Sequence, residues 1–148
     1  YFCYTFGAQV AEVVVQPQSG EVRVTGIWAA HDAGRIIFPH GSKGQMLGGI
    51  AQGLGYALLE GFEYEKGSPR QHNFDTYHIP RATDLPEIES TYIETALPEG
   101  PYGAKNLAEP VMIATAPAIA NAIFHATGLR IRRLPIRPAD ILRGFDTQ

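Results

Sequence analysis

Glu109 is the residue of this sequence best placed to act as a general base. It ends the segment GPYGAKNLAE and directly precedes Pro110, a residue suited to the first turn of a helix. Backbone N–H groups at a helix start favour the ionised carboxylate, whereas apolar surroundings favour the neutral acid, and a general base needs that balance near neutral pH. The alternative, more frequent on spacing alone, is a carboxylate that only stabilises the helix start, by about 0.3–1 kcal/mol.

The segment before Glu109 is a candidate binding loop. Successive backbone N–H groups at a helix start can hold an anion, and Lys105 would add a positive charge. The order of residues matches neither GxxxxGK[ST] nor GxGxxG, so an ordinary surface turn is the alternative. The candidate residues are Gly103, Ala104, Lys105, Asn106, Leu107 and Ala108.

Gln45 is a second candidate ligand contact, at the start of a glycine-rich segment. Its carboxamide can both donate and accept hydrogen bonds, although a solvated residue of a first helical turn is the alternative. His31 and Asp32 end a predicted strand, where either they are a base with its orienting carboxylate or Asp32 organises a turn. Residues 72–78 hold two histidines and an aspartate, but their surroundings favour an extended chain, so no metal site is expected.

Composition limits the classes of protein to consider. The 148 residues, 45% hydrophobic and 18% charged, predict a single globular domain. A net charge of -3 provides no general attraction to nucleic acid, and glycines and glutamines in residues 45–59 argue against a membrane span there. A single cysteine, Cys3, excludes an internal disulfide and a CxxC site. The first residue is not Met, so a piece of a longer chain is expected.

Alternating apolar and polar residues predict the strands. Residues 6–17 and 21–32, joined by a turn at QSGE, are expected to form a β-hairpin. Further strands are expected at 62–65, 88–96 and 131–134.

Two long helices are expected to cover this sheet. The first should begin near Lys43 and stop at Gly61, with its glycines allowing close approach of another backbone or a ligand. The second, residues 110–127, is apolar on nearly every face; Pro117 should kink or divide it, and Gly128 should end it. A final helical turn is expected in PADILRGF. The predicted fold class is α+β: an N-terminal hairpin and further strands in a mostly antiparallel sheet, packed against a glycine-rich and an apolar proline-containing helix.

Three segments carry linked motifs: HDAGRIIFPHGSKGQMLGGIAQGLGYALLE, NFDTYHIPRATDLPEIE and GPYGAKNLAEPVMIATAPAIANAIFHATGLRIRRLP. In order and spacing they resemble the C-terminal part of the molybdenum-binding large subunit of the xanthine dehydrogenase and aldehyde oxidase family. The resemblance extends from about Phe6 to Arg143. It is closest to the bacterial branch that includes isoquinoline oxidoreductase and carbon monoxide dehydrogenase large subunits.

The resemblance implies a molybdopterin cofactor with molybdenum, in bacteria often in the cytosine dinucleotide form. Glu109 matches the glutamate of the family's GEP motif and would be the base that takes a proton from the attacking hydroxyl. Gln45 matches the glutamine that contacts the pterin, and residues 103–108 match the segment that lines it. The substrate would be an aldehyde or an N-heterocycle, oxidised with oxygen from water.

The sequence departs from the family pattern at two positions of this loop. The family usually has GAKGVGEP, whereas Asn106 and Ala108 here replace glycines. If either position requires a positive φ, Ala108 is the less tolerant of the two. A loop degraded in this way would suit another class of function, a non-catalytic assembly or interaction domain derived from the family.

The resemblance also implies partners. Residues 1–148 are expected to be one domain, the C-terminal molybdopterin-binding segment of a longer large subunit, and to carry one wall of the cofactor site. The rest of that subunit would complete the site. Iron–sulfur and flavin centres would belong to other domains or subunits, since one cysteine cannot hold a cluster. No nucleic-acid partner is expected; a cytoplasmic location is expected, with the periplasm open.

Overall fold

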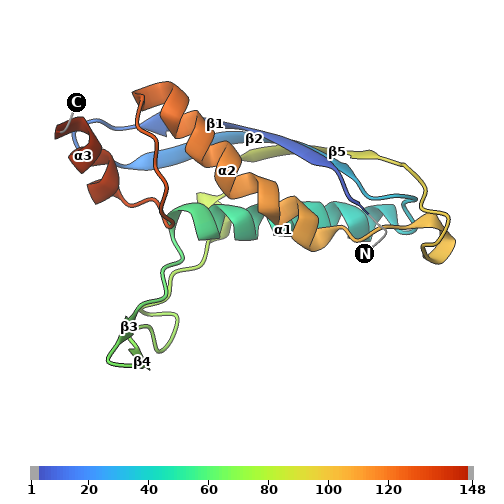
Figure 1. Ribbon diagram of the computed structural model, residues 1–148, viewed down its shortest axis with the longest axis horizontal. Coiled ribbons are helices and arrows are strands. Elements are labelled where there is room, and N and C mark those ends of the chain that lie inside the picture. The colour runs from blue at the N-terminus through green and yellow to red at the C-terminus, as the bar shows by residue number, and fades with distance from the viewer. Residues whose placement is uncertain (1–3, 147–148) are drawn as a thin grey trace.

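The computed structural model describes residues 4–146 and contains a three-stranded sheet with two long helices on one face (Figure 1). Strands β1 (Gly7–Val15) and β2 (Val22–Asp32) form the predicted antiparallel hairpin. Strand β5 (Glu87–Ile93) pairs with β2 in parallel, because a helix carries the chain back across the sheet between them. The predicted α+β class, a hairpin-based sheet packed against the two expected helices, is confirmed.

Helix α1 (Pro39–Leu58) begins and ends earlier than its glycines suggested. The predicted start at Lys43 is wrong, because Pro39 occupies the first helical position, where its fixed φ suits a helix and its missing N–H has no partner to lose. At the other end, the Gly55 carbonyl accepts from the N–H groups of both Leu59 and Glu60, so the helix closes before Gly61.

The glycines of α1 allow helix α2 (Ala108–Thr127) to approach very closely. A Cβ atom built on Gly53 would lie 2.4 Å from Cβ of Thr115, and one on Gly49 would lie 2.8 Å from the carbonyl oxygen of Ala108. Gly48 belongs to another side of α1, where an added Cβ would meet nothing within 4 Å. The predicted close approach of a second backbone is therefore confirmed for one face of α1.

This difference between glycines gives a stability test. Gly53→Ala should lower the free energy of unfolding by about 1–3 kcal/mol, because the new methyl group overpacks a helix contact that cannot widen easily. Gly48→Ala, the matched control in the same helix, should raise it by up to about 1 kcal/mol through helix propensity alone. Denaturant unfolding measures both, and equal effects at the two positions would contradict the packing described here.

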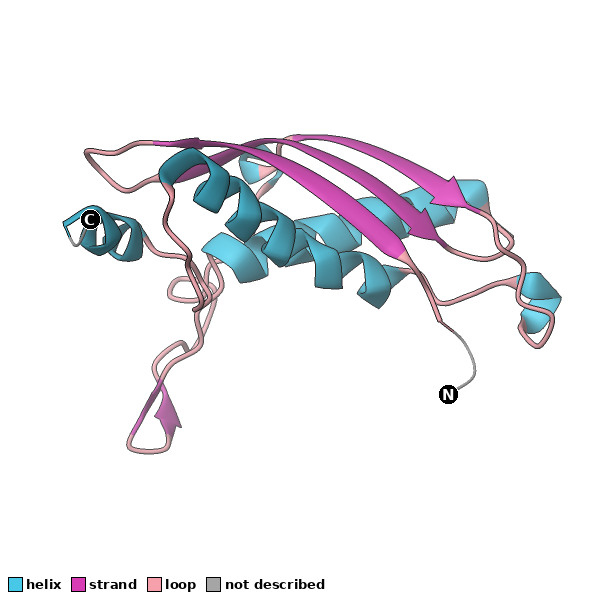
Figure 2. Cartoon of the chain, turned by 45° about the horizontal axis from the view of Figure 1, so that its top comes forward, coloured by secondary structure: helices cyan, strands magenta, loops and turns pink. Residues whose placement is uncertain are grey.

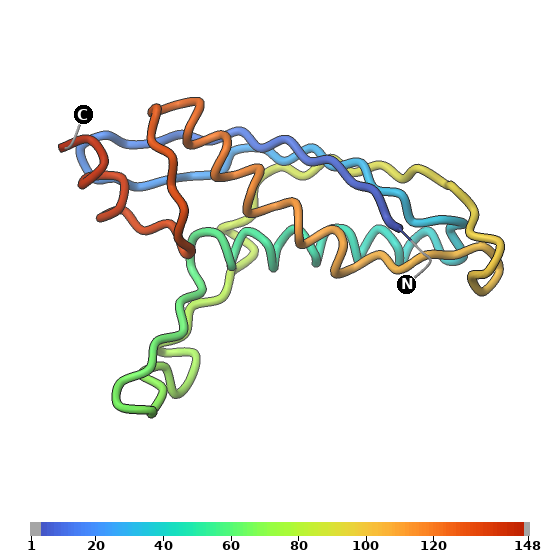
Figure 3. Tube along the Cα trace, in the orientation of Figure 1, coloured from blue at the N-terminus to red at the C-terminus, as the bar shows by residue number. Residues whose placement is uncertain are grey.

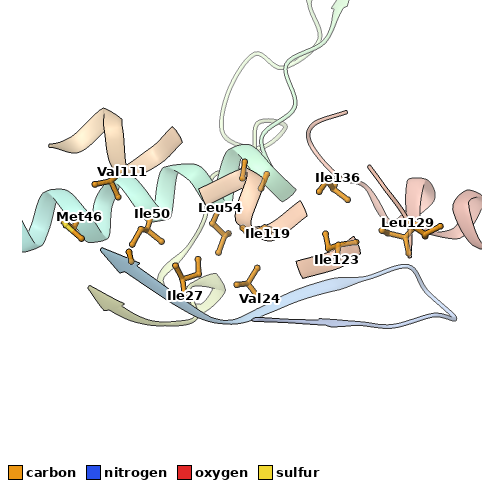
Figure 4. Packing of buried hydrophobic residues seen from close by; sticks show 14 residues of the cluster. Val24, Ile27, Met46, Ile50, Leu54, Val111, Ile119, Ile123, Leu129 and Ile136 are labelled. Atoms are coloured by element: carbon orange, nitrogen blue, oxygen red, sulfur yellow. The ribbon is translucent and has the colours of Figure 1, made fainter. Parts of the chain in front are cut away.

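The core lies between the sheet and the two helices (Figure 2). Figure 4 shows Ile27 of β2 facing Ile50 and Leu54 of α1, with Ile119 of α2 beside them. All four side chains are buried. Their burial fixes the helices against the sheet, since apolar area removed from water stabilises the fold by about 25 cal/mol per Å².

Helix α2 is continuous through Pro117, so the predicted division does not occur; this proline lies on the exposed side. Gly128 ends the helix in the left-handed conformation, with φ of 77°, as predicted. By length and composition α2 would also suit a membrane span, but its inner face packs against β1 and α1. Its outer face is not covered within residues 4–146, where Ile113 is 69% exposed.

The rest of the chain forms an arm and a small C-terminal helix. Strands β3 (Tyr64–Glu65) and β4 (Ser68–Pro69) form the arm, which projects from the end of α1 (Figure 3). The predicted strand at 131–134 is wrong: these residues form an irregular bend before Ile136, whose N–H donates to the Ala57 carbonyl at 2.7 Å. Helix α3 (Pro138–Asp146) matches the expected final turn.

Candidate functional site

The predicted site residues meet at one end of the molecule. Strand β2 ends there and both long helices begin there (Figure 1). A cavity of about 350 Å³ lies between the loop after β2, the first turns of α1 and the loop before α2. Its lining residues include four of the predicted set: Gln45, Ala104, Lys105 and Leu107. Gly103, Asn106, Ala108 and Glu109 do not line it but belong to the adjoining chain.

The loop before α2 is bonded to the loop after β2 through their backbones. The Arg35 N–H donates to the Gly103 carbonyl at 2.8 Å, and the Lys105 N–H donates to the Ala33 carbonyl at 3.0 Å. Gly34 is required at this contact, because a Cβ atom there would lie 2.5 Å from the Gly103 oxygen. The two loops therefore form one unit that shapes the cavity wall.

The positive φ angles of this loop lie at Tyr102 (55°) and Gly103 (85°). Neither Asn106 nor Ala108 has a positive φ, and Ala108 is the first residue of α2. The two substitutions for glycine therefore leave the backbone unstrained, and the conformation expected to be at risk at Ala108 is an ordinary helical one.

A buried ion pair holds the loop in place. Nζ of Lys105 lies 2.6 Å from Oδ2 of Asp32, and their side chains are only 6% and 4% exposed. Oδ1 of Asp32 accepts from the N–H groups of Gly34 at 3.0 Å and Thr95 at 3.3 Å. Burial raises the pKa of Asp32, but Lys105 and these two N–H groups outweigh it, so the pKa lies below its usual value.

The ion pair decides between two interpretations of the sequence. Asp32 organises the turn, as one alternative held, and the bonds of its carboxylate go to the loops. Lys105 does not present its charge to the cavity, because its ammonium group is paired with Asp32 and also donates to the Tyr4 carbonyl at 3.2 Å. The charge of Lys105 is therefore used inside the protein.

Gln45 and Glu109 are both exposed. Gln45 lies on the second turn of α1, because that helix begins at Pro39, and Glu109 lies on the first turn of α2. No side chain caps the start of α2, since its N-cap is Leu107, so Glu109 lies among unbonded N–H groups at a helix start. The apolar surroundings expected around Glu109 are not present within residues 4–146, where its side chain is exposed.

A polar cluster of the half-buried Gln9 with the buried His31 and Thr115 was not anticipated. Gln9 Nε2 donates to the Val111 carbonyl at 2.7 Å and lies 3.0 Å from His31 Nε2, while Gln9 Oε1 accepts from the Thr115 hydroxyl at 2.8 Å. Burial lowers the pKa of His31. One signal was present in the sequence: Gln9 is the polar residue on the inward side of β1, in phase with Ala11 and Val13.

Comparisons with known proteins agree on one family. Residues 1–86 match the family model of a molybdopterin cofactor-binding domain. The chain is 36% identical over 142 residues to the xanthine dehydrogenase molybdenum-binding subunit of Escherichia coli O157:H7, which covers 95% of this chain and 19% of that protein.

Solved structures show the same fold. Quinoline 2-oxidoreductase from Pseudomonas putida 86 matches with a TM-score of 0.84 and 32% identity, over 92% of this chain and 18% of that one. Aldehyde oxidoreductase from Desulfovibrio gigas matches with a TM-score of 0.86 and 32% identity, over 96% of this chain and 15% of that one. The chain spans about a fifth of the length of the curated relatives it matches.

Proposed function

This chain belongs to the molybdopterin cofactor-binding family of xanthine dehydrogenase and aldehyde oxidoreductase molybdenum-binding subunits, and from that premise we propose that it supplies one wall of the cofactor site and the catalytic carboxylate of a molybdenum hydroxylase. Its substrate is an aldehyde or an N-heterocycle. The observation that carries the proposal is the convergence of Gln45 and the loop before α2 on one cavity, at the end of the molecule where Glu109 lies in the first turn of α2.

The residues at the cavity fit a molybdopterin. The carboxamide of Gln45 offers both donors and an acceptor, as the polar edge of a pterin requires. Helix α1 begins beside the cavity with no acidic residue in its first turn and no side-chain cap, so backbone N–H groups are available for phosphate. This free helix start suits the phosphate that the cofactor carries, and we propose the dinucleotide form, with Ala104, Lys105 and Leu107 on the other side of the cavity.

The chemistry divides between cofactor and protein. When bound, the molybdenum cofactor supplies the two-electron oxidation of the substrate carbon. Glu109 accepts the proton that is released when water-derived oxygen is added to that carbon. The paired Asp32 and Lys105 keep the loop before α2 in one position and so hold the first turn of α2 beside the cavity.

We propose that the remainder of the large subunit completes this site. It would cover Glu109, which is exposed here, and supply the desolvation that residues 4–146 lack. The outer face of the sheet also needs covering, since Val10 is 64% and Trp28 is 41% exposed beside a shallow hollow of about 370 Å³. Iron–sulfur and flavin centres in other domains or subunits then carry the electrons away.

Cofactor retention tests the proposal. The assembled subunit should contain molybdenum and pterin in equal amounts, and Gln45→Leu should retain the cofactor about tenfold more weakly, because one hydrogen bond is lost. Gln52→Leu is the matched control: an exposed glutamine of the same helix that does not line the cavity. Metal analysis and pterin fluorescence after dialysis measure both. A correctly assembled subunit without molybdenum and pterin would instead indicate a non-catalytic assembly domain.

A further inference from the structure

The cluster of Gln9, His31 and Thr115 joins β1, β2 and α2 next to the turn that carries Glu109. The carboxamide of Gln9 uses both donors and one acceptor site inside the protein: toward Val111 at 2.7 Å, toward His31 at 3.0 Å and from Thr115 at 2.8 Å. His31 is only 1% exposed and Thr115 is fully buried. Buried polar groups are usually bonded, and the bonds of Gln9 and Thr115 hold the cluster together. Nδ1 of His31 is the exception in this cluster: it is buried and has no hydrogen-bond partner within residues 4–146.

The Val111 carbonyl fixes the orientation of the Gln9 carboxamide. A carbonyl can only accept, so the amide nitrogen must face it. The same nitrogen donates its second hydrogen toward Nε2 of His31, which therefore accepts and carries no proton. The neutral imidazole is packed in one place, because Gly7 lies so close to Nδ1 that a Cβ atom there would be 2.2 Å away.

No side chain caps the first turn of α2. Its N-cap, Leu107, offers no side-chain bond, so neighbouring elements must hold it. On one side, the Ala108 carbonyl packs closely against Gly49 of α1. On the other side, the Gln9 side chain of β1 donates a hydrogen bond to the Val111 carbonyl. Glu109 lies between these two contacts, which act together with the Asp32–Lys105 pair that holds the loop before the helix.

We propose that Gln9 is a positioning residue for Glu109, and that His31 and Thr115 hold its carboxamide in the productive orientation. The inference rests on the proposed role of Glu109 as the base. Without the bond to Val111, the first turn of α2 can shift relative to the sheet, and a displacement of about 1 Å at a catalytic group can reduce turnover by about a hundredfold.

The test uses the assembled molybdenum enzyme that contains this chain. Gln9→Leu should lower kcat per bound molybdenum by about 10- to 100-fold and change KM by less than about twofold. In the Glu109→Gln background, where no base remains to be placed, the same substitution should change the single-turnover rate by less than about twofold. Val13→Ala, on the same inward side of β1 and remote from the Val111 carbonyl, should leave kcat per bound molybdenum unchanged.

Three outcomes would overturn the inference: an unchanged kcat in Gln9→Leu, an equal loss in both backgrounds, or an equal loss in Val13→Ala. If Glu109→Gln itself keeps its turnover, the proposed function fails first and the inference with it. If Gln9→Leu does not assemble, Thr115→Val decides, because it keeps the shape of the side chain and removes the hydroxyl that donates to Gln9 at 2.8 Å and lies 3.4 Å from the Val111 carbonyl. A loss of several-fold in kcat that disappears in the Glu109→Gln background supports the inference, and an unchanged kcat overturns it.

Discussion

Glu109→Gln lowers kcat of the assembled enzyme by about 10²- to 10⁴-fold while molybdenum and pterin remain bound. The amide has the shape of the carboxylate but cannot accept a proton at neutral pH, and a positioned general base contributes a factor of this size. The cofactor is retained because its proposed contacts are Gln45 and the 103–108 backbone. Steady-state kinetics normalised to bound molybdenum measure the effect.

Two further variants define what the result means. Glu109→Asp keeps the charge but shortens the side chain by one methylene, so we expect a loss of kcat smaller than that of Glu109→Gln. Glu99→Gln changes another exposed carboxylate of the segment that leads to the loop, and it should leave kcat within about twofold. Turnover of Glu109→Gln close to that of the unaltered enzyme, with cofactor bound, would refute the assignment of the base.

Lys105→Met is expected to have the largest effect on stability. It leaves the Asp32 carboxylate buried without its cation, and breaking a buried pair in this way costs about 3–5 kcal/mol. Denaturant unfolding at neutral pH measures the loss. Adding Asp32→Leu to Lys105→Met removes the unpaired charge and should recover part of it. Arg81→Met, in the exposed pair with Asp84, is the control and should leave the unfolding midpoint unchanged.

The free energy of unfolding should depend on the same ion pair at acid pH. Because the pKa of Asp32 is lower in the folded protein than in the unfolded chain, its contribution is complete above the ordinary carboxyl pKa of about 4. It is lost as the pH falls below that value through the lowered folded pKa, where the unfolded chain binds the proton first. The Lys105→Met chain should lose less stability over this acid range. An identical acid dependence in both proteins would show that Asp32 does not contribute in this way.

Local patterns predicted the elements well wherever one signal dominated. The hairpin followed from strict alternation on both sides of a turn, and the end of α2 followed from Gly128. The start of α1 was misplaced because the glycines of FPHGSKG outweighed the signal of Pro39 at a first helical position. Residues 131–134 alternate like a strand, but alternation alone does not provide a partner strand, and here they form a bend.

The sequence indicated residues of which four line one cavity, but it did not indicate the bonds around that cavity. The resemblance to known motifs indicated Gln45, the 103–108 loop and Glu109. The pairing of Asp32 with Lys105, 73 residues apart, has no local signature, and it changed the expected role of the lysine. The link from Gln9 to Val111 spans 102 residues and depends on how α2 crosses β1, which the tertiary packing alone determines.

Because Gly49 has no side chain, it brings helix α1 close to the start of α2. Gln45 lies one helical turn before Gly49, and Glu109 directly follows Ala108. The carbonyl of Ala108 packs against Gly49, where a side chain would block it. The separation between the proposed cofactor contact, Gln45, and the proposed base, Glu109, is therefore set by the distance between two backbones. Rotamer exchange, the commonest motion of exposed side chains, moves the tips of these two residues but leaves the distance between their Cα atoms unaltered. In the proposed enzyme, this Cα–Cα distance stays the same whichever substrate lies between the two residues.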